Sequence, residues 1–131
     1  MERIVVRTDP GYTVQVGTGV LDNAGKEIAK VVPGRRAAIL SDSNVMPLYA
    51  QALSRQLIAE GFSVATITFP AGEASKNPDT LLRVINELAA LSLTRADVLV
   101  ALGGGVTGDL GGLAASLYLR GIHCVQIPTS L

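Results

Sequence analysis

The 131-residue sequence contains one cysteine, one histidine and no tryptophan. A single cysteine excludes an internal disulfide framework and is typical of the reducing cytoplasm. Together with the single histidine, it also excludes a metal site made from several such ligands of one chain. The first residues lack the apolar run of a signal peptide, and the longest weakly polar stretch, 110–119, is about half as long as a membrane span. These absences predict a cytoplasmic protein that does not enter a membrane.

An excess of charge of one sign is also missing. Eleven lysines and arginines balance eleven aspartates and glutamates. Nucleic acids and anionic membrane surfaces attract a basic excess, so the balance argues against both as partners. Hydrophobic residues make up 48% and charged residues 17% of the chain, which is typical of a folded protein. The length is that of one domain, able to bury roughly two-thirds of its surface.

Hydrophobic spacing and turn residues divide the chain into strands and helices. Two short strands, 2–8 and 12–16, are expected to form a hairpin around Asp9-Pro10-Gly11. A helix is expected to begin at Asn77, a favourable N-cap before Pro78. Its buried face is expected to carry Leu81, Leu82, Ile85, Leu88 and Ala89. The other expected helices are 21–32, 45–60 and 109–119, and the expected apolar strands are 37–40, 62–69, 97–102 and 122–127.

Strands and helices alternate from Ala37 onward, and the apolar strands show little alternation of polar and apolar residues. Strands of this kind belong to parallel sheets that are covered on both faces. With right-handed crossovers, the pattern predicts an α/β fold: a Rossmann-like doubly wound, mainly parallel sheet with helices on both faces and an N-terminal β-hairpin. Such sheets bind ligands at the carboxyl ends of their strands. The segments that follow these ends are 41–44, 70–76, 103–109 and 128–131.

Residues 103–108, GGGVTG, match the pattern G-x-G-x-x-G between an expected strand and an expected helix. Glycines let the backbone approach a diphosphate, whose charge the free amides of a helix start attract. The alternative is a glycine-rich turn that only permits close packing of the helix on the sheet. In dinucleotide-binding sheets an acidic residue about 20 positions after this pattern holds the adenosine ribose, but no acidic residue follows Asp109. Asp42 is a candidate substitute, although an Asx-turn or a helix cap would also explain it.

Other polar residues allow two interpretations each. Asp109 either caps the start of its helix or accepts from a ribose hydroxyl. The loop from Gly72 to Lys76 offers an acceptor for sugar hydroxyls and a cation for phosphate, or is simply solvated. Arg120 suits the negative end of its helix. His123 and Cys124 lie in an apolar strand, which favours core or edge positions.

Three segments together resemble those of the 3-dehydroquinate synthase family. Residues 102–131, LGGGVTGDLGGLAASLYLRGIHCVQIPTSL, are similar to the family's signature region. Residues 41–45, SDSNV, and 69–77, FPAGEASKN, resemble its two other cofactor segments in the same order. The resemblance extends over the whole chain.

The resemblance implies that residues 1–131 are an N-terminal NAD-binding domain. A C-terminal domain, absent from this chain, would hold a divalent metal, zinc or cobalt. The family converts 3-deoxy-D-arabino-heptulosonate 7-phosphate to 3-dehydroquinate and phosphate in the shikimate pathway, and NAD is reduced and reoxidised within one turnover. A small sugar-phosphate substrate and a homodimer are implied. With no catalytic residue or metal ligand of its own, this chain alone is expected to be inactive.

The resemblance also implies roles for individual residues. The residues implied to contact the adenosine part of NAD are Asp42, Ser43 and Asn44, and those implied to contact NAD from the next loop are Gly72, Glu73, Ala74, Ser75 and Lys76. The diphosphate is implied to contact Gly104, Gly105 and Val106, with Thr107 and Gly108 in the same turn. Asp109 is implied to contact a ribose, and Thr129 and Ser130 the nicotinamide. Arg120 is implied to contact the substrate, and one way for it to do so is across a dimer interface.

Two further functions stay open at this point. The chain could be the NAD domain of another sugar-phosphate cyclase, acting on a sedoheptulose phosphate or a glucose phosphate. It could also be a stand-alone nucleotide-binding module without chemistry. Because the sequence stops directly after an expected interior strand, we expect it to be part of a longer protein.

Overall fold

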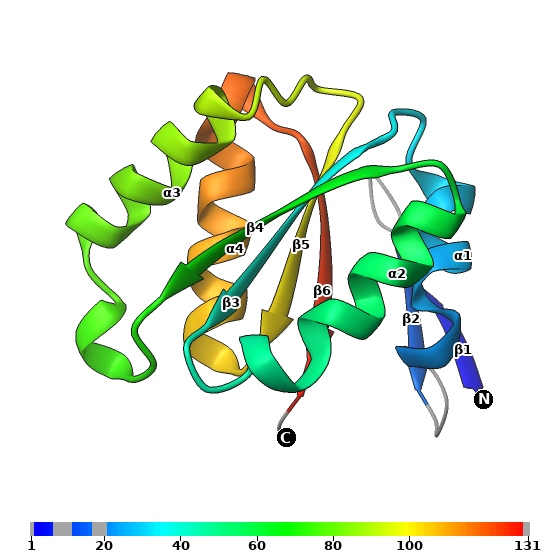
Figure 1. The fold of residues 1–131 in the computed structure, drawn as a ribbon, viewed down its shortest axis with the longest axis horizontal. Coiled ribbons are helices and arrows are strands. Elements are labelled where there is room, and N and C mark those ends of the chain that lie inside the picture. The colour runs from blue at the N-terminus through cyan, green and yellow to red at the C-terminus, as the bar shows by residue number, and fades with distance from the viewer. Residues whose placement is uncertain (1, 7–11, 17–20, 130–131) are drawn as a thin grey trace.

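The computed structural model describes residues 2–6, 12–16 and 21–129 (Figure 1). The expected turn Asp9-Pro10-Gly11, Thr8 and Ser130 lie outside the described residues. Strands β1 (Glu2–Val6) and β2 (Tyr12–Val16) pair antiparallel with each other, as the hairpin prediction required. The remaining elements are α1 (Ala24–Val31), β3 (Arg36–Asp42), α2 (Gln51–Ala59), β4 (Ser63–Phe69), α3 (Pro78–Ala90), β5 (Val98–Gly103), α4 (Gly105–Leu117) and β6 (His123–Pro128).

Strands β3 to β6 form one parallel sheet in the order β4-β3-β5-β6. The chain first moves from β3 to β4 and then crosses back over β3 to β5. Right-handed crossovers in opposite directions place their helices on opposite faces, which confirms the predicted Rossmann-like α/β fold. The direction of winding changes between β3 and β5, the position where such sheets bind ligands. Strand β6 lies at an edge of this sheet, so the expectation of an interior strand was wrong.

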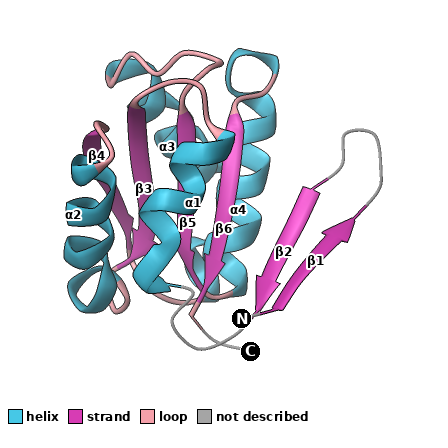
Figure 2. Ribbon diagram, turned by 90° about the vertical axis from the view of Figure 1, so that its right-hand side faces the viewer, coloured by secondary structure: helices cyan, strands magenta, loops and turns pink. Residues whose placement is uncertain are grey.

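Helices cover both faces of the sheet (Figure 2). A hydrophobic core lies between the sheet and the helices on each face. Successive side chains of a strand point to opposite faces, so Ala37 and Ile39 of β3 meet α1 and α2. Ala38 and Leu40 meet α3 and α4 instead. All four are buried. This double burial explains why β5 and the middle of β3, residues 37–40, are apolar on both faces.

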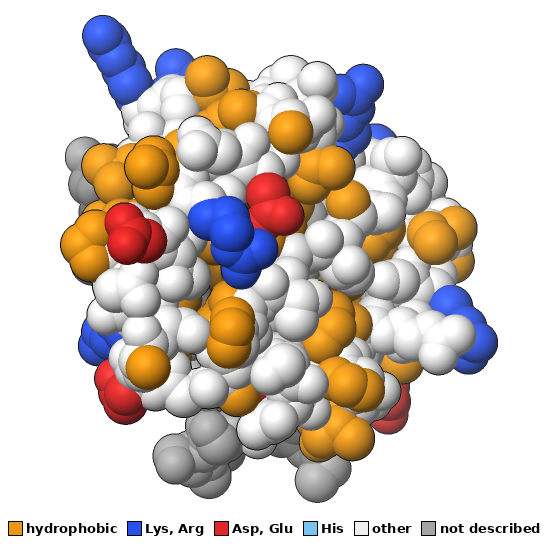
Figure 3. Space-filling model, turned by 60° about the vertical axis from the view of Figure 1, so that its left-hand side comes forward, with side chains coloured by type: hydrophobic (Ala, Val, Ile, Leu, Met, Phe, Trp, Pro, Cys, Tyr) orange, Lys and Arg blue, Asp and Glu red, His pale blue; other side chains and the backbone are white. Residues whose placement is uncertain are grey.

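Helix α3 begins as predicted, with the Asn77 side chain accepting a hydrogen bond of 2.8 Å from the Thr80 amide. Its buried face differs from the prediction. Val84 is fully buried, whereas Leu82 is 57% exposed. On the face of the molecule that carries α3, hydrophobic side chains lie in small groups among polar and charged ones (Figure 3).

Helix α4 begins four residues before the predicted start at Asp109. Its first turn is already closed at Gly108, whose amide donates to the Gly104 carbonyl at 3.0 Å. The helix also ends earlier than expected, because Leu119 and Arg120 adopt left-handed backbone angles, with φ of 50° and 62°. Asp109 therefore lies in the second turn of α4, where it does not cap the helix start.

Candidate functional site

The carboxyl ends of all four parallel strands lie in one row. In the register of the sheet, Asp42 at the end of β3 is opposite Phe69 of β4, and Gly103 at the end of β5 is opposite Pro128 of β6. The loops that follow these residues therefore share one edge, as the sequence predicted. Of the last segment, Pro128 and Thr129 are described, and the Thr129 amide donates to the Gly103 carbonyl at 3.0 Å.

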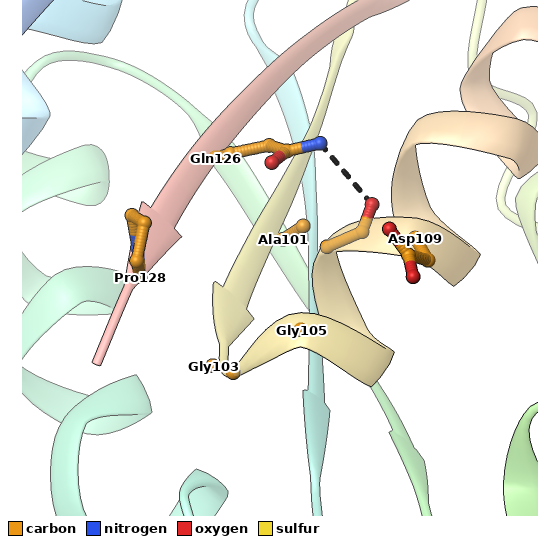
Figure 4. A pocket seen from close by; sticks show the side chains of 8 residues that line it. Ala101, Gly103, Gly105, Asp109, Gln126 and Pro128 are labelled. Carbon is orange, nitrogen blue, oxygen red and sulfur yellow. Dashed lines mark hydrogen bonds between the residues drawn. The ribbon is translucent and has the colours of Figure 1, made fainter. Parts of the chain in front are cut away.

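A cleft of about 420 Å³ opens at this edge, between β5, β6 and the start of α4 (Figure 4). Its volume is within the range of small-molecule sites. Most of the lining is backbone, and only Asp109 and Gln126 contribute polar side chains. The lining residues are Ala101, Gly103, Gly104, Gly105, Gly108, Asp109, Gln126 and Pro128.

The start of α4 presents free backbone amides to this cleft. The first amides of a helix have no partner within it, and among the described residues no side chain caps this end at Gly104. A Cβ atom added at Gly105 would meet nothing within 4 Å. Open amides at the positive end of a helix dipole form a binding site for an anion, and a diphosphate fits this chemistry.

Thr107 lies beneath the same turn. Its side chain is 1% exposed, and its hydroxyl has no hydrogen-bond partner among the described residues. A Cβ atom at Gly103 would lie 2.6 Å from this hydroxyl oxygen, so only glycine fits there. A buried polar group without a partner is costly.

Asp42 adopts the Asx-turn that was one interpretation of the sequence. Its Oδ1 atom accepts hydrogen bonds of 2.8 Å from the amides of Asn44 and Val45. Within the described ranges Oδ2 has no partner, so half of the carboxylate can still accept from a ligand. The Asn44 side chain is exposed beside it.

The 70–76 loop is tied to the end of β3. The Ala71 amide donates to the Ser43 hydroxyl at 3.0 Å. Ser75 is buried and donates its hydroxyl to the Pro70 carbonyl, so it shapes the loop from inside. Gly72, Glu73 and Ala74 are exposed, and Gly72 has a positive φ of 114°.

Lys76 and Asp109 form an ion pair across the edge of the sheet, with Nζ 2.8 Å from Oδ2. The hydrogen bond and the charge of Asp109 raise the pKa of Lys76 above its ordinary value. Both side chains remain about half exposed, so the pair is a connection between two loops more than a source of stability. Its chemical effect is to neutralise a carboxylate that would otherwise repel an anion at the start of α4.

Arg120 does not join this group. It lies past the far end of α4, whose thirteen residues span about 20 Å. The side chain is exposed at the end of the sheet that carries the amino ends of the strands. Arg120 and the cleft of the same chain are therefore on opposite ends of one helix.

His123 and Cys124 lie on the edge strand β6, as one of their interpretations proposed, and both residues are exposed. Loss of hydration around the sulfur nevertheless raises the pKa of the Cys124 thiol to about 11. Among residues 2–6, 12–16 and 21–129, no three His, Cys, Asp or Glu side chains gather closely enough to hold a metal ion. Of the helices within these ranges, none has the length and apolar character to span a bilayer.

Sequence reasoning did not identify Gln126, although its side chain lines the cleft. It lies within the segment 102–131 that resembles the family's signature region, but no role was implied for it. The available signal was the alternation of β6, which places Gln126 opposite Ala101 of β5, and Ala101 lies against Gly111 of α4. Using that signal required the strand order, which the sequence alone did not provide.

Comparisons with known proteins agree with this geometry. Residues 66–131 match the family model for the 3-dehydroquinate synthase N-terminal region. The 3-dehydroquinate synthase of Clostridium acetobutylicum is 42% identical over 120 residues, which cover 92% of this chain and 34% of that protein. The Lactococcus lactis subsp. cremoris enzyme is 47% identical over 123 residues, covering 94% and 35%. The chain thus spans about a third of the length of these relatives.

Solved structures of two sugar-phosphate cyclases share the fold. A 2-deoxy-scyllo-inosose synthase, solved with carbaglucose-6-phosphate, NAD⁺ and Co²⁺, has a TM-score of 0.85 and 26% identity, covering 98% of this chain and 34% of that one. The 2-epi-5-epi-valiolone synthase of Streptomyces hygroscopicus subsp. jinggangensis, with NAD⁺ and Zn²⁺, has a TM-score of 0.78 and 32% identity, covering 91% and 32%. Fold, motif order and sequence identity agree: the chain belongs to the 3-dehydroquinate synthase family.

Proposed function

We propose that residues 1–131 are the NAD-binding N-terminal domain of a cytoplasmic 3-dehydroquinate synthase. That enzyme converts 3-deoxy-D-arabino-heptulosonate 7-phosphate to 3-dehydroquinate and phosphate in the shikimate pathway. The observation that carries the proposal is the uncapped start of α4, with open space at Gly105, beside the point where the sheet reverses its winding.

The residues at this edge of the sheet support successive contacts along a bound dinucleotide. The amides of Gly104, Gly105 and Val106 would hold the diphosphate, and the unpartnered Thr107 hydroxyl would add a donor. The free Oδ2 atom of Asp42 would accept from the adenosine ribose, with Ser43 and Asn44 beside it. On the other side, Thr129 and Ser130 would lie toward the nicotinamide.

The 70–76 loop would complete the cofactor site. Gly72, Glu73 and Ala74 are exposed and would contact NAD, whereas the buried Ser75 would support them. Lys76 would hold the Asp109 carboxylate toward a ribose and cancel its charge next to the diphosphate.

When bound, NAD supplies a hydride acceptor that is reduced and reoxidised within one turnover. We place the divalent metal and the catalytic groups outside this chain and expect the chain alone to be inactive. Arg120 lies too far from the cleft of its own chain. We therefore assign its substrate contact to the site of a second copy in a homodimer.

Other sugar-phosphate cyclases are the second candidate function, because two such enzymes match the fold over 91% or more of this chain. The identity favours dehydroquinate synthase, at 42–47% against 26–32% for these cyclases. An assay of the whole protein on the heptulosonate phosphate, a sedoheptulose phosphate and glucose 6-phosphate discriminates between them. Turnover of either of the last two alone would favour the second candidate.

Titration of this chain with NAD tests the cofactor assignment. We expect weak binding, detected by calorimetry or saturation-transfer NMR, with shifted amide resonances at Gly104, Gly105 and Val106. Matched titrations with nicotinamide, which lacks a diphosphate, should leave these resonances in place. Absence of any interaction at millimolar NAD would contradict the proposal.

A further inference from the structure

Gln126 reaches from β6 across the cleft to α4 (Figure 4). Its Nε2 atom donates a hydrogen bond of 3.1 Å to the carbonyl oxygen of Gly108, in the first turn of the helix. Gln126 lies within the segment 102–131 that resembles the family's signature region, but it is not among the cofactor residues assigned above.

Two glycines of α4 make room for this side chain. Residues Gly108 and Gly112 are four apart and therefore lie on one face of the helix. A Cβ atom at Gly108 would lie 3.2 Å from the Oε1 atom of Gln126, and one at Gly112 would lie 3.2 Å from its Nε2 atom. Both distances are tighter than ordinary contacts, so the glycines form a shallow groove that holds the carboxamide.

The hydrogen bond connects β6 to the residues that face the diphosphate. Gly108 accepts from Gln126 through its carbonyl and donates through its amide to Gly104, at 3.0 Å. At the other end of the glycine loop, the Thr129 amide donates to the Gly103 carbonyl. Strand β6 thus fastens the loop both before and after its open amides.

We propose that Gln126 is a positioning residue that fixes the first turn of α4 and thereby sets the affinity of this turn for the diphosphate of a dinucleotide. The inference rests on the proposed function. The donor matters as well as the shape, because the Gly108 carbonyl offers only an acceptor to the side chain above it. A carboxylate of the same size would oppose that carbonyl and add negative charge to the cleft.

The test compares Gln126→Met, which keeps the length of the side chain but removes the donor, with Gln51→Met. Gln51 is exposed on α2, on the other face of the sheet, and provides the matched control. We expect Gln126→Met to weaken NAD binding about three- to tenfold, the effect of one neutral hydrogen bond. Amide hydrogen exchange at Gly108 without ligand should become faster, while the thermal midpoint falls by no more than a few degrees.

A pH series separates the effect of the hydrogen-bond donor on NAD affinity from the effect of side-chain packing. Gln126→Glu should bind NAD more weakly than Gln126→Met at neutral pH. As the pH falls toward the carboxyl pKa of about 4.3, the protonated acid can donate to the Gly108 carbonyl. NAD affinity above that of Gln126→Met at the same acidic pH supports the inference, whereas recovery only to that level overturns it.

The outcomes separate the two proposals. The inference is supported if the wild-type chain binds NAD while Gln126→Met binds NAD more weakly and exchanges its Gly108 amide hydrogen faster. Equal affinity or equal exchange in Gln126→Met overturns it and leaves the proposed function intact. Failure of the wild-type chain to bind NAD overturns the proposed function and this inference with it.

Discussion

Gly105 and Gly111 belong to the same helix but have opposite surroundings. A Cβ atom at Gly105 would meet nothing within 4 Å, whereas one at Gly111 would lie 2.8 Å from the Cβ atom of Ala101 on β5. The first glycine leaves backbone amides open to a ligand. The second lets α4 approach the sheet closely enough to cover it.

This difference bears on both interpretations of the glycine-rich segment. A diphosphate site and a close helix–sheet contact were alternatives at the level of the sequence. In the structure both kinds of surroundings occur within α4: open space at Gly105 in the first turn, and close contacts at Gly108 and, in the next turn, at Gly111 and Gly112. The comparison therefore predicts that substitutions in the two turns will affect different properties.

The largest effect is expected from Gly111→Val. The added side chain would collide with Ala101 and crowd Leu40, both in the core between sheet and helix. Overpacking of this kind should lower the free energy of unfolding by about 3 kcal/mol. Urea denaturation measures the change, and a midpoint equal to that of the wild type would show that α4 can move away from β5 freely.

Gly105→Ala should have the opposite profile. Its methyl group meets no protein atom, and alanine is the better helix former, so the free energy of unfolding should stay equal or rise by up to about 1 kcal/mol. The same methyl group would stand among the open amides, and we expect NAD affinity to fall about tenfold, or 1.4 kcal/mol. Calorimetry and thermal unfolding of one preparation give both values, and unchanged affinity would contradict the location of the diphosphate.

Thr107→Val tests the buried hydroxyl between the two turns. Replacing an unpartnered hydroxyl by a methyl group should raise the free energy of unfolding by about 1 kcal/mol in the absence of ligand. NAD binding should weaken, because the ligand loses a donor. Thr66→Val, at an exposed position of β4, is the control for adding a methyl group. A destabilised Thr107→Val protein would indicate that the hydroxyl already has a partner.

Lys76→Gln should produce the smallest change, because the ion pair with Asp109 is exposed. Asp109 raises the pKa of Lys76 in the folded state. The pair's contribution is therefore complete below the unfolded pKa of about 10.4 and is lost as the pH rises through the higher folded value. Wild type and Lys76→Gln should differ in stability by a constant small amount between about pH 6 and 9 and converge at more alkaline pH. A difference that already disappears near neutral pH would exclude this ion pair as its source.

Local sequence predicted most elements because their signals are local. Asn77 caps α3 through an atom only three residues away, and Gly61, whose φ is 91°, stands just past the end of α2. The start of α4 was misplaced because three successive glycines disfavour a helix. Contact between Gly111 and β5 outweighs that preference, and this contact depends on the tertiary fold.

The candidate site was predictable only in part, for a similar reason. The motifs around Asp42, Lys76 and Gly105 could be found in the sequence, and parallel strands place such loops at one edge. The pairing of Lys76 with Asp109 joins residues from different loops. The bond from Gln126 to Gly108 joins a strand to a helix, 18 residues apart in the chain. Neither pair follows from local spacing.

The amino-acid sequence by itself determined the parallel α/β fold and the presence of a glycine-rich turn before a helix, because apolar strands, helix periodicity and glycine chemistry act over a few neighbouring residues. Only the tertiary structure decided which glycines stay open, which carboxylate is neutralised and which side chain supports the turn. Those outcomes depend on strand order and on how closely α4 packs against β5 and β6, and both arise from contacts between residues distant in sequence.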